Sequence, residues 1–193
     1  MGVLIGPNTL YYVIVRPKGK LREDFDFSDE KVRKPALLRP EMGERGTGDM
    51  ATTVIAITNQ KGGVGKTTTA AALLTGLHRR GAAVLGVDMD PQGSLGFSLG
   101  LDIEHCTTIY DVFRGQAEPE QAIVRTDTCD ILPSNILLSG AELEFNRPGR
   151  EFLLKTALSK VEDQYDYIII DTPPALSLLT VNAYVAKVSL IIP

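Results

Sequence analysis

The stretch that decides the fold lies at residues 59–68 and reads NQKGGVGKTT. It follows the apolar run VIAI at residues 54–57 and precedes a segment with the apolar spacing of an amphipathic helix. The apolar positions of this helix are Ala70, Leu73, Leu74 and Leu77. The sequence RRG at residues 79–81 predicts the helix end, with cations in the last turn and a glycine stop. A glycine-rich turn between a buried strand and a helix is where a phosphate-binding loop belongs.

Strand and helix patterns alternate along the rest of the chain. Apolar strand candidates lie at residues 84–87, 130–132, 167–170 and 188–192, and helical stretches lie at 151–163 and 176–187. Strands that are apolar on both faces and separated by helices indicate a parallel sheet covered on each side. The sequence therefore predicts a doubly wound, mainly parallel α/β sheet in a three-layer, Rossmann-like arrangement.

Length, charge and cysteine usage exclude several classes of protein. The 193 residues suffice for one or two domains, and 44% apolar with 23% charged residues is ordinary globular composition. A formal net charge of −4 argues against indiscriminate nucleic-acid binding by the whole surface. No apolar run reaches the roughly 18–20 residues that span a bilayer, and the first residues lack a secretory signal. Cys106 and Cys129 have no metal-binding or disulfide spacing, so we expect a soluble cytoplasmic protein.

The composition changes near Met50. Residues 16–49 contain nine basic and eight acidic residues without a sustained apolar period, which is typical of a loop or of disorder. The apolar stretch at residues 10–15 could form a strand, but it has no obvious partner. We predict an extension at residues 1–49, which is either a regulatory arm or a stretch upstream of a true start at Met50. Residues 50–193 then form one domain with 11 basic and 16 acidic residues, a net charge of −5.

The glycine-rich loop has the residue types that bind phosphate. Its three glycines let successive backbone N–H groups turn inward, and the following helix points its positive end at the anion. Lys66 is placed to reach the β- and γ-phosphates, and the Thr67 hydroxyl to ligate Mg²⁺. The pattern G-x-x-x-x-G-K-[ST] fails at one position, because Gln60 replaces the first glycine, and an extra lysine, Lys61, precedes the loop glycines. The alternative interpretation is an ordinary glycine-rich turn with incidental lysines.

Carboxylates follow two of the predicted strands. Asp171 ends the apolar run at 167–170, so we expect it at the carboxyl edge of the sheet beside the loop, where it would hold Mg²⁺ through a water. Asp88 and Asp90 follow the strand at 84–87 and share a parity, so they would face one way if the chain stays extended. One of these two carboxylates could orient a water or hold the metal. The alternatives are a turn-capping aspartate at 171 and a polar loop after 87.

Three segments together resemble the ParA/MinD group of deviant-Walker ATPases, whose fold is that of P-loop NTPases. They are KGGVGKTTTAAALLTGL at 61–77, VLGVDMDPQGSLGFSLG at 84–100 and YDYIIIDTPPALSLLTVNA at 165–183. The connecting segments TTIYDVFRGQAEPEQAI and DILPSNILLSGAELE are similar to those of chromosome and plasmid partition ParA proteins, in order and spacing. The sequence DPQG favours ParA, of the Soj-like kind, over MinD. The resemblance covers about residues 52 to 193.

The resemblance implies roles for particular residues. Lys61 would reach across an ATP-sandwiched homodimer to the partner's nucleotide, while Lys66 grips the phosphates of its own subunit. Asp90 would position the hydrolytic water in the first switch loop, and residues 172–174 would form the second switch. The residues expected to bind ATP are Lys61, Gly62, Gly63, Val64, Gly65, Lys66, Thr67 and Thr68. Those expected to hold Mg²⁺ are Thr67, Asp90 and Asp171, the last at the Walker B position.

The resemblance also implies a partition ATPase that switches between monomer and dimer, is stimulated by a ParB-like partner and binds DNA nonspecifically on the nucleoid. The family continues beyond Pro193 with helices and a strand that supply adenine contacts and much of the basic DNA-binding surface. We therefore expect the phosphate machinery to be retained, the sheet to be incomplete at this end with an exposed apolar edge, and DNA binding to be reduced. Two alternatives remain open: a nucleotide-binding interaction module with little turnover, and a MinD-like positioning ATPase. The latter needs an amphipathic membrane helix that this chain lacks.

Overall fold

A parallel sheet organises the fold. The computed structural model describes residues 2–6, 9–14, 52–186 and 189–193. The described strands form one eight-stranded sheet in the order β1-β2-β8-β3-β7-β4-β6-β5. Their bounds are β1 (Gly2–Gly6), β2 (Thr9–Ile14), β3 (Thr53–Ile57), β4 (Val84–Asp88), β5 (Val124–Arg125), β6 (Asp130–Leu132), β7 (Tyr167–Asp171) and β8 (Ser189–Ile192). Strands β8, β3, β7, β4 and β6 are parallel, which confirms the predicted mainly parallel α/β class.

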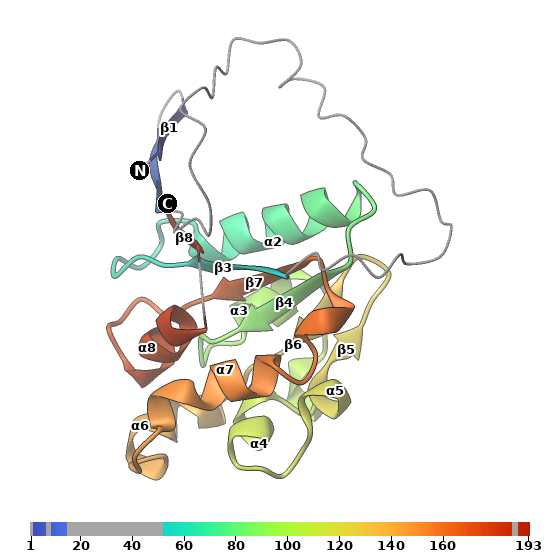
Figure 1. Cartoon of the computed structure of the whole chain (residues 1–193), viewed down its shortest axis with the longest axis vertical. Coiled ribbons are helices and arrows are strands. Elements are labelled where there is room, and N and C mark those ends of the chain that lie inside the picture. Colours follow the sequence, from blue (N-terminus) through green and yellow to red (C-terminus); the bar gives the residue numbers. More distant parts are fainter. Residues whose placement is uncertain (1, 7–8, 15–51, 187–188) are drawn as a thin grey trace.

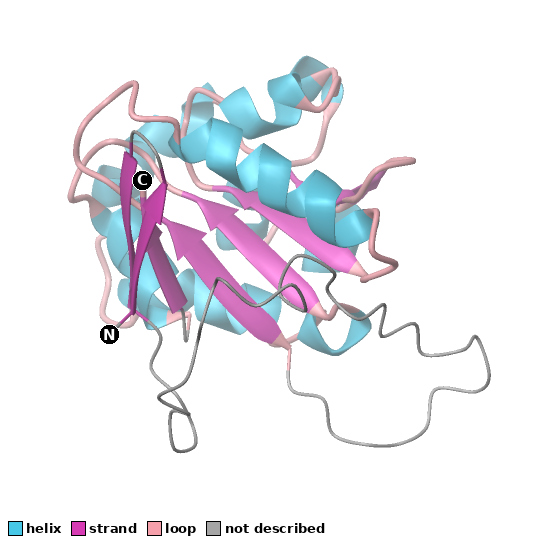
Figure 2. Ribbon diagram, turned by 90° about the horizontal axis from the view of Figure 1, so that it is seen from above, coloured by secondary structure: helices cyan, strands magenta, loops and turns pink. Residues whose placement is uncertain are grey.

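Helices cover both faces of the sheet, with α2 on one face and α7 and α8 on the other (Figure 1). The α-helices are α2 (Lys66–His78), α3 (Ser94–Ser98), α4 (Ile109–Phe113), α5 (Pro119–Ala122), α6 (Ala141–Glu144), α7 (Leu153–Leu158) and α8 (Leu178–Val185). Short 3-10 turns are η1 (Ile103–His105), η2 (Ile136–Gly140), η3 (Arg150–Phe152) and η4 (Glu162–Gln164). Viewed from above, α2 lies over the parallel strands and runs roughly along their direction (Figure 2). Among the described residues, no helix combines the length and apolar character that crossing a membrane requires.

The predicted amphipathic helix is confirmed in α2. Ala70 and Leu74 are fully buried against the sheet, and Leu73 and Leu77 are partly buried beside them. The helix ends at His78, and Gly81 follows with a φ of 85°, a left-handed conformation that favours glycine. Two other helical predictions are too long. The stretch at 151–163 is broken into η3, α7 and η4, and the stretch at 176–187 is helical only at Leu178–Val185.

The predicted central strands are buried on both faces, as the continuous apolar runs indicate. Every residue of β4 is buried, and so are four of the five residues of β7. The two strands pair in parallel with Asp88 opposite Asp171, so two carboxylates end adjacent strands at one edge. This edge lies beside the glycine-rich loop that follows β3.

The prediction that residues 10–15 lack a strand partner is wrong. Strand β2 pairs antiparallel with β1 and with β8, where Tyr12 lies opposite Ile192 and Ile14 opposite Leu190. The hairpin therefore runs along the edge of β8 that we expected to be exposed. A strand bound to such an edge satisfies its free N–H and C=O groups. The charged segment predicted at 16–49 lies outside the described residues.

Candidate functional site

The glycine-rich loop leaves the carboxyl end of β3 and leads directly into α2. Gly63 and Gly65 have φ values of 69° and 88°, which residues with side chains rarely adopt. A Cβ atom at either position would meet no other atom within 4 Å, so the backbone conformation and not crowding explains these glycines. Gly65 is also the N-cap of α2, and its carbonyl accepts the Thr69 N–H at 2.8 Å. The loop thus places the open N-terminus of a 13-residue helix at the sheet edge.

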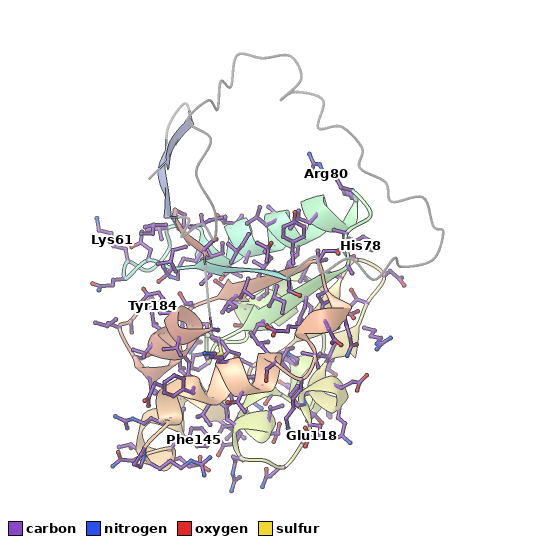
Figure 3. The ribbon with its side chains drawn as sticks, viewed as in Figure 1. Lys61, His78, Arg80, Glu118, Phe145 and Tyr184 are labelled. Atoms are coloured by element: carbon purple, nitrogen blue, oxygen red, sulfur yellow. The ribbon has the colours of Figure 1, made fainter. Side chains whose placement is uncertain are left out.

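The two lysines of the loop have opposite environments. Lys66 is only 7% exposed, and its Nζ donates to the carbonyl of Lys61 at 3.3 Å, across the mouth of the loop. Lys61 is exposed, and its side chain extends away from the body of the protein (Figure 3). One cation therefore faces into the loop, while the other is free to reach a second molecule.

The first turn of α2 presents hydrogen-bond donors and no acidic side chain. No side chain caps its N–H groups, and Thr67 and Thr68 follow Lys66 in this turn. Unpaired N–H groups and the helix dipole both favour an anion at such a terminus. The loop glycines, the helix terminus and Lys66 thus converge as the sequence predicts for a phosphate site.

Contacts from distant parts of the chain hold the base of the loop. The Asn59 side chain accepts the Lys61 N–H at 3.0 Å and donates to the Pro193 carbonyl at 2.7 Å. The Thr58 and Tyr184 hydroxyls lie 2.9 Å apart. Sequence reasoning missed these contacts, because the partners are 126 and 134 residues apart and no local pattern marks them.

Asp171 lies where a metal ligand is expected. It is fully buried at the end of β7, and neither carboxylate oxygen has a hydrogen-bond partner of ordinary geometry. Burial raises the pKa of Asp171 to about 6, and the neighbouring Thr67 hydroxyl and Lys66 ammonium only partly offset that effect. Two unpartnered oxygens in a buried carboxylate fit a divalent cation that would supply the missing counter-charge.

The condition under which Asp88 and Asp90 would face one way, an extended chain, is not met after Asp88. The strand ends at Asp88, which is fully buried, and the chain then turns so that Asp90 is partly exposed. Burial raises the pKa of Asp88 to about 7, with the Asp171 charge adding to the effect. Asp90 Oδ1 accepts the Gln92 N–H at 3.0 Å, and the Asp90 charge contributes to the raised pKa of Asp171. The Met89 N–H, one residue before Asp90, donates to the Asp171 carbonyl at 2.9 Å, so the chain reaches Asp90 directly from the end of β7.

The segment expected to form the second switch begins directly after Asp171. Thr172 is fully buried, and its N–H and hydroxyl donate to the Ile57 carbonyl at 3.3 and 2.8 Å. Since Ile57 ends β3 just before the loop, this segment is tied to the loop's own strand.

The donor set suits magnesium bound together with a polyphosphate. Within the described part of the chain, no three His, Cys, Asp or Glu side chains come together as a complete metal site. Magnesium usually takes one or two carboxylates and completes its coordination with phosphate oxygens and water. Asp171 and Thr67 fit this partial set, so the cation would bind with the nucleotide and not before it.

A phosphate loop at a strand–helix junction, a buried lysine and a strand-terminal aspartate define a P-loop nucleotide-binding protein. Residues 52–193 match the family model described as an AAA domain. The Sporulation initiation inhibitor protein Soj of Bacillus subtilis is 48% identical over 146 residues, which cover 72% of this chain and 57% of Soj. The Chromosome partitioning protein ParA of Myxococcus xanthus is 44% identical over 155 residues, which cover 78% of this chain and 54% of that protein.

A solved structure has the same fold over the matched region. Cobyrinic acid a,c-diamide synthase from Mycobacterium smegmatis, with bound ADP and magnesium, superposes with a TM-score of 0.68 at 48% identity. The match covers 70% of this chain and 56% of that chain. The chain belongs to the ParA/Soj family of partition ATPases, and it spans about half the length of the curated relatives it matches.

We expect substitution of Lys66 by alanine to abolish ATP binding, because the loop loses the cation that faces into it. Titration with a fluorescent ATP analogue in the presence of Mg²⁺ measures the effect. Lys155→Ala, on the far side of the sheet in α7, is the control and should bind as the parent does. If Lys66→Ala keeps its affinity within about threefold, a loss below ~0.7 kcal/mol, the assigned role is contradicted.

Proposed function

We propose that this protein binds and hydrolyses ATP, and that ATP controls its association into a homodimer that acts in the segregation of chromosomal or plasmid DNA. The observation that carries the proposal is that the two loop lysines have different environments: Lys66 is buried, and Lys61, five residues earlier, is exposed. A P-loop protein that acts alone needs only the buried lysine. The exposed Lys61 gains a role when a second subunit brings its own nucleotide opposite.

The described residues support an assignment of roles. The amides of residues 61–68 and the Lys66 ammonium bind the phosphates; Thr67 and Asp171 would hold Mg²⁺, which would supply positive charge to the phosphoryl oxygens. The Asp90 carboxylate is partly exposed at the same edge and orients the attacking water. Hydrolysis develops negative charge on the transferred oxygens, and fixed donors already in place stabilise that charge.

Lys61 of the partner supplies the last of these donors. A cation inserted from another chain is worth roughly 10³–10⁵ in rate in other phosphoryl-transfer systems. Hydrolysis then depends on dimerisation, because the nucleotide site of a monomer lacks the Lys61 side chain of a partner. The rate of ATP hydrolysis in the dimer therefore sets how long the assembled state lasts.

Family membership supports the cellular role. Myxococcus xanthus ParA is a chromosome partitioning protein by name, and the Soj and ParA matches cover 72% and 78% of this chain. We therefore propose a cytoplasmic, nucleoid-associated protein with a ParB-like stimulating partner and nonspecific DNA as its track. The net charge of −5 over residues 50–193 places any DNA-binding surface on a local basic patch and not on the whole surface.

Substitution of Asp90 by alanine should stop hydrolysis while leaving Mg-ATP binding intact, because the carboxylate acts on water and not on the phosphates. Phosphate release by the purified chain, measured over several hours to capture slow turnover, is compared for parent and variant. Equal rates in both proteins, at the background level, would contradict the enzyme function and favour a binding module.

Substitution of Lys61 by alanine should spare ATP binding by the monomer and impair ATP-dependent dimerisation. Light scattering with Mg-ATP, under conditions that prevent turnover, reports the mass of the assembly. Lys155→Ala again serves as the control for loss of an exposed lysine. Dimer formation by Lys61→Ala at the same ATP concentration as the parent would rule out the role in trans.

A further inference from the structure

Asp88 is a buried carboxylate whose two oxygens both accept backbone N–H groups. Oδ1 accepts from Asp90 N at 3.0 Å, and Oδ2 accepts from Leu95 N at 2.9 Å. A longer contact of 3.5 Å joins Oδ2 to Gly96 N. The carboxylate therefore links the start of the turn at residues 89–93, called here the Asp90 loop, to the first turn of α3.

The Asp90 loop is also held from its other side. The Ser134 side chain, in the segment after β6, has no exposed surface, and its hydroxyl donates to the Asp90 carbonyl. Within the loop, the Gly93 N–H donates to the same carbonyl at 3.0 Å. Gly93 has a φ of 65°, and a Cβ there would lie 2.4 Å from Ile103 Cδ1. The backbone of the Asp90 loop is thus held by hydrogen bonds with Asp88, Ser134 and Gly93.

The environment of Asp88 favours an indirect part in the chemistry. A carboxylate that orients water or binds a metal must present a lone pair to solvent or to the ion. Asp88 has no exposed surface, and its oxygens are occupied by the backbone of the loop that carries Asp90. Its register partner Asp171 is equally buried but has no such hydrogen bonds. The two neighbouring carboxylates therefore have different tasks.

We propose that Asp88 is a positioning residue that, together with Ser134, holds Asp90 in place for hydrolysis while touching neither nucleotide nor metal. The inference rests on the proposed role of Asp90 in ATP hydrolysis. A carboxylate suits this buried position because each of its two oxygens accepts a hydrogen bond from a backbone N–H. An amide of the same shape accepts at one end only and presents N–H to a donor at the other.

The test is Asp88→Asn in the full chain, measured by turnover, binding and amide hydrogen exchange. Because a displacement of about 1 Å can lower a rate about 100-fold, we expect hydrolysis at saturating Mg-ATP to fall about 10- to 100-fold. The dissociation constant of Mg-ATP and the Mg²⁺ dependence should stay within about threefold, since the phosphate loop is intact. Exchange of the amides between residues 90 and 96 should accelerate.

Asp166→Asn is the matched control. Asp166 Oδ2 also accepts a backbone N–H, that of Ala83 at 2.8 Å, but this aspartate is exposed and lies just before β7, at the end of the strand opposite Asp171. It should leave turnover, binding and exchange at residues 90–96 unchanged. Ser134→Ala is the second variant, and it should lower turnover at constant affinity in the same way as Asp88→Asn.

Two results would overturn the proposal. One is unchanged turnover and unchanged exchange at residues 90–96 in Asp88→Asn or, if that variant does not fold, in Ser134→Ala. The other is a loss of Mg-ATP or Mg²⁺ affinity above about tenfold in Asp88→Asn, which would make Asp88 a ligand. Absence of hydrolysis by the parent protein would instead contradict the proposed function, and the exchange comparison alone would then decide whether Asp88 anchors the loop.

Discussion

Two carboxylates buried on adjacent strands, Asp88 and Asp171, are the constraint on which the rest of the site depends. Burying one charge without a partner is costly, and burying two side by side adds their repulsion. Here, both pKa values are raised well above that of a free aspartate. The structure compensates the two differently: backbone N–H groups satisfy Asp88, while Asp171 keeps oxygens without partners beside Thr67 and Lys66. Asp88 thus holds the backbone of the Asp90 loop, and Asp171 remains available to a cation.

This arrangement connects the parts of the site through the backbone. The Asp171 carbonyl accepts the Met89 N–H at 2.9 Å, so the end of β7 contacts the start of the Asp90 loop. Thr172 is bonded to Ile57 at the end of β3, next to the phosphate loop. The three segments that would contact nucleotide, metal and water therefore share hydrogen bonds at one sheet edge.

Most of the fold was predictable because its signals are local. The strands β3, β4, β6 and β7 are short apolar runs, and α2 combines an apolar stripe with a glycine stop. Hydrophobic periodicity and helix-terminating residues are therefore enough to predict these elements. The phosphate loop was predictable for the same reason, since its glycines and lysines are contiguous. Whether the chain stays extended past Asp88 was not predictable, because the hydrogen bonds at this turn come from Asp88 itself and from Ser134 far along the sequence. The pairing of β2 with β8 and the contact of Asn59 with Pro193 likewise depend on tertiary proximity.

The proposed function requires the amides between Gln60 and Thr68 to enclose the terminal phosphates of a magnesium nucleotide. Amide chemical shifts of the isotopically labelled chain, followed by NMR during titration with Mg-ATP and with AMP, report on these groups. We expect large, saturable shifts for Gly62, Gly63, Gly65, Lys66 and Thr67 with Mg-ATP, and much weaker effects with AMP, which lacks the β- and γ-phosphates. Shifts of these amides that are absent with Mg-ATP, or equal for the two nucleotides, would contradict this binding mode.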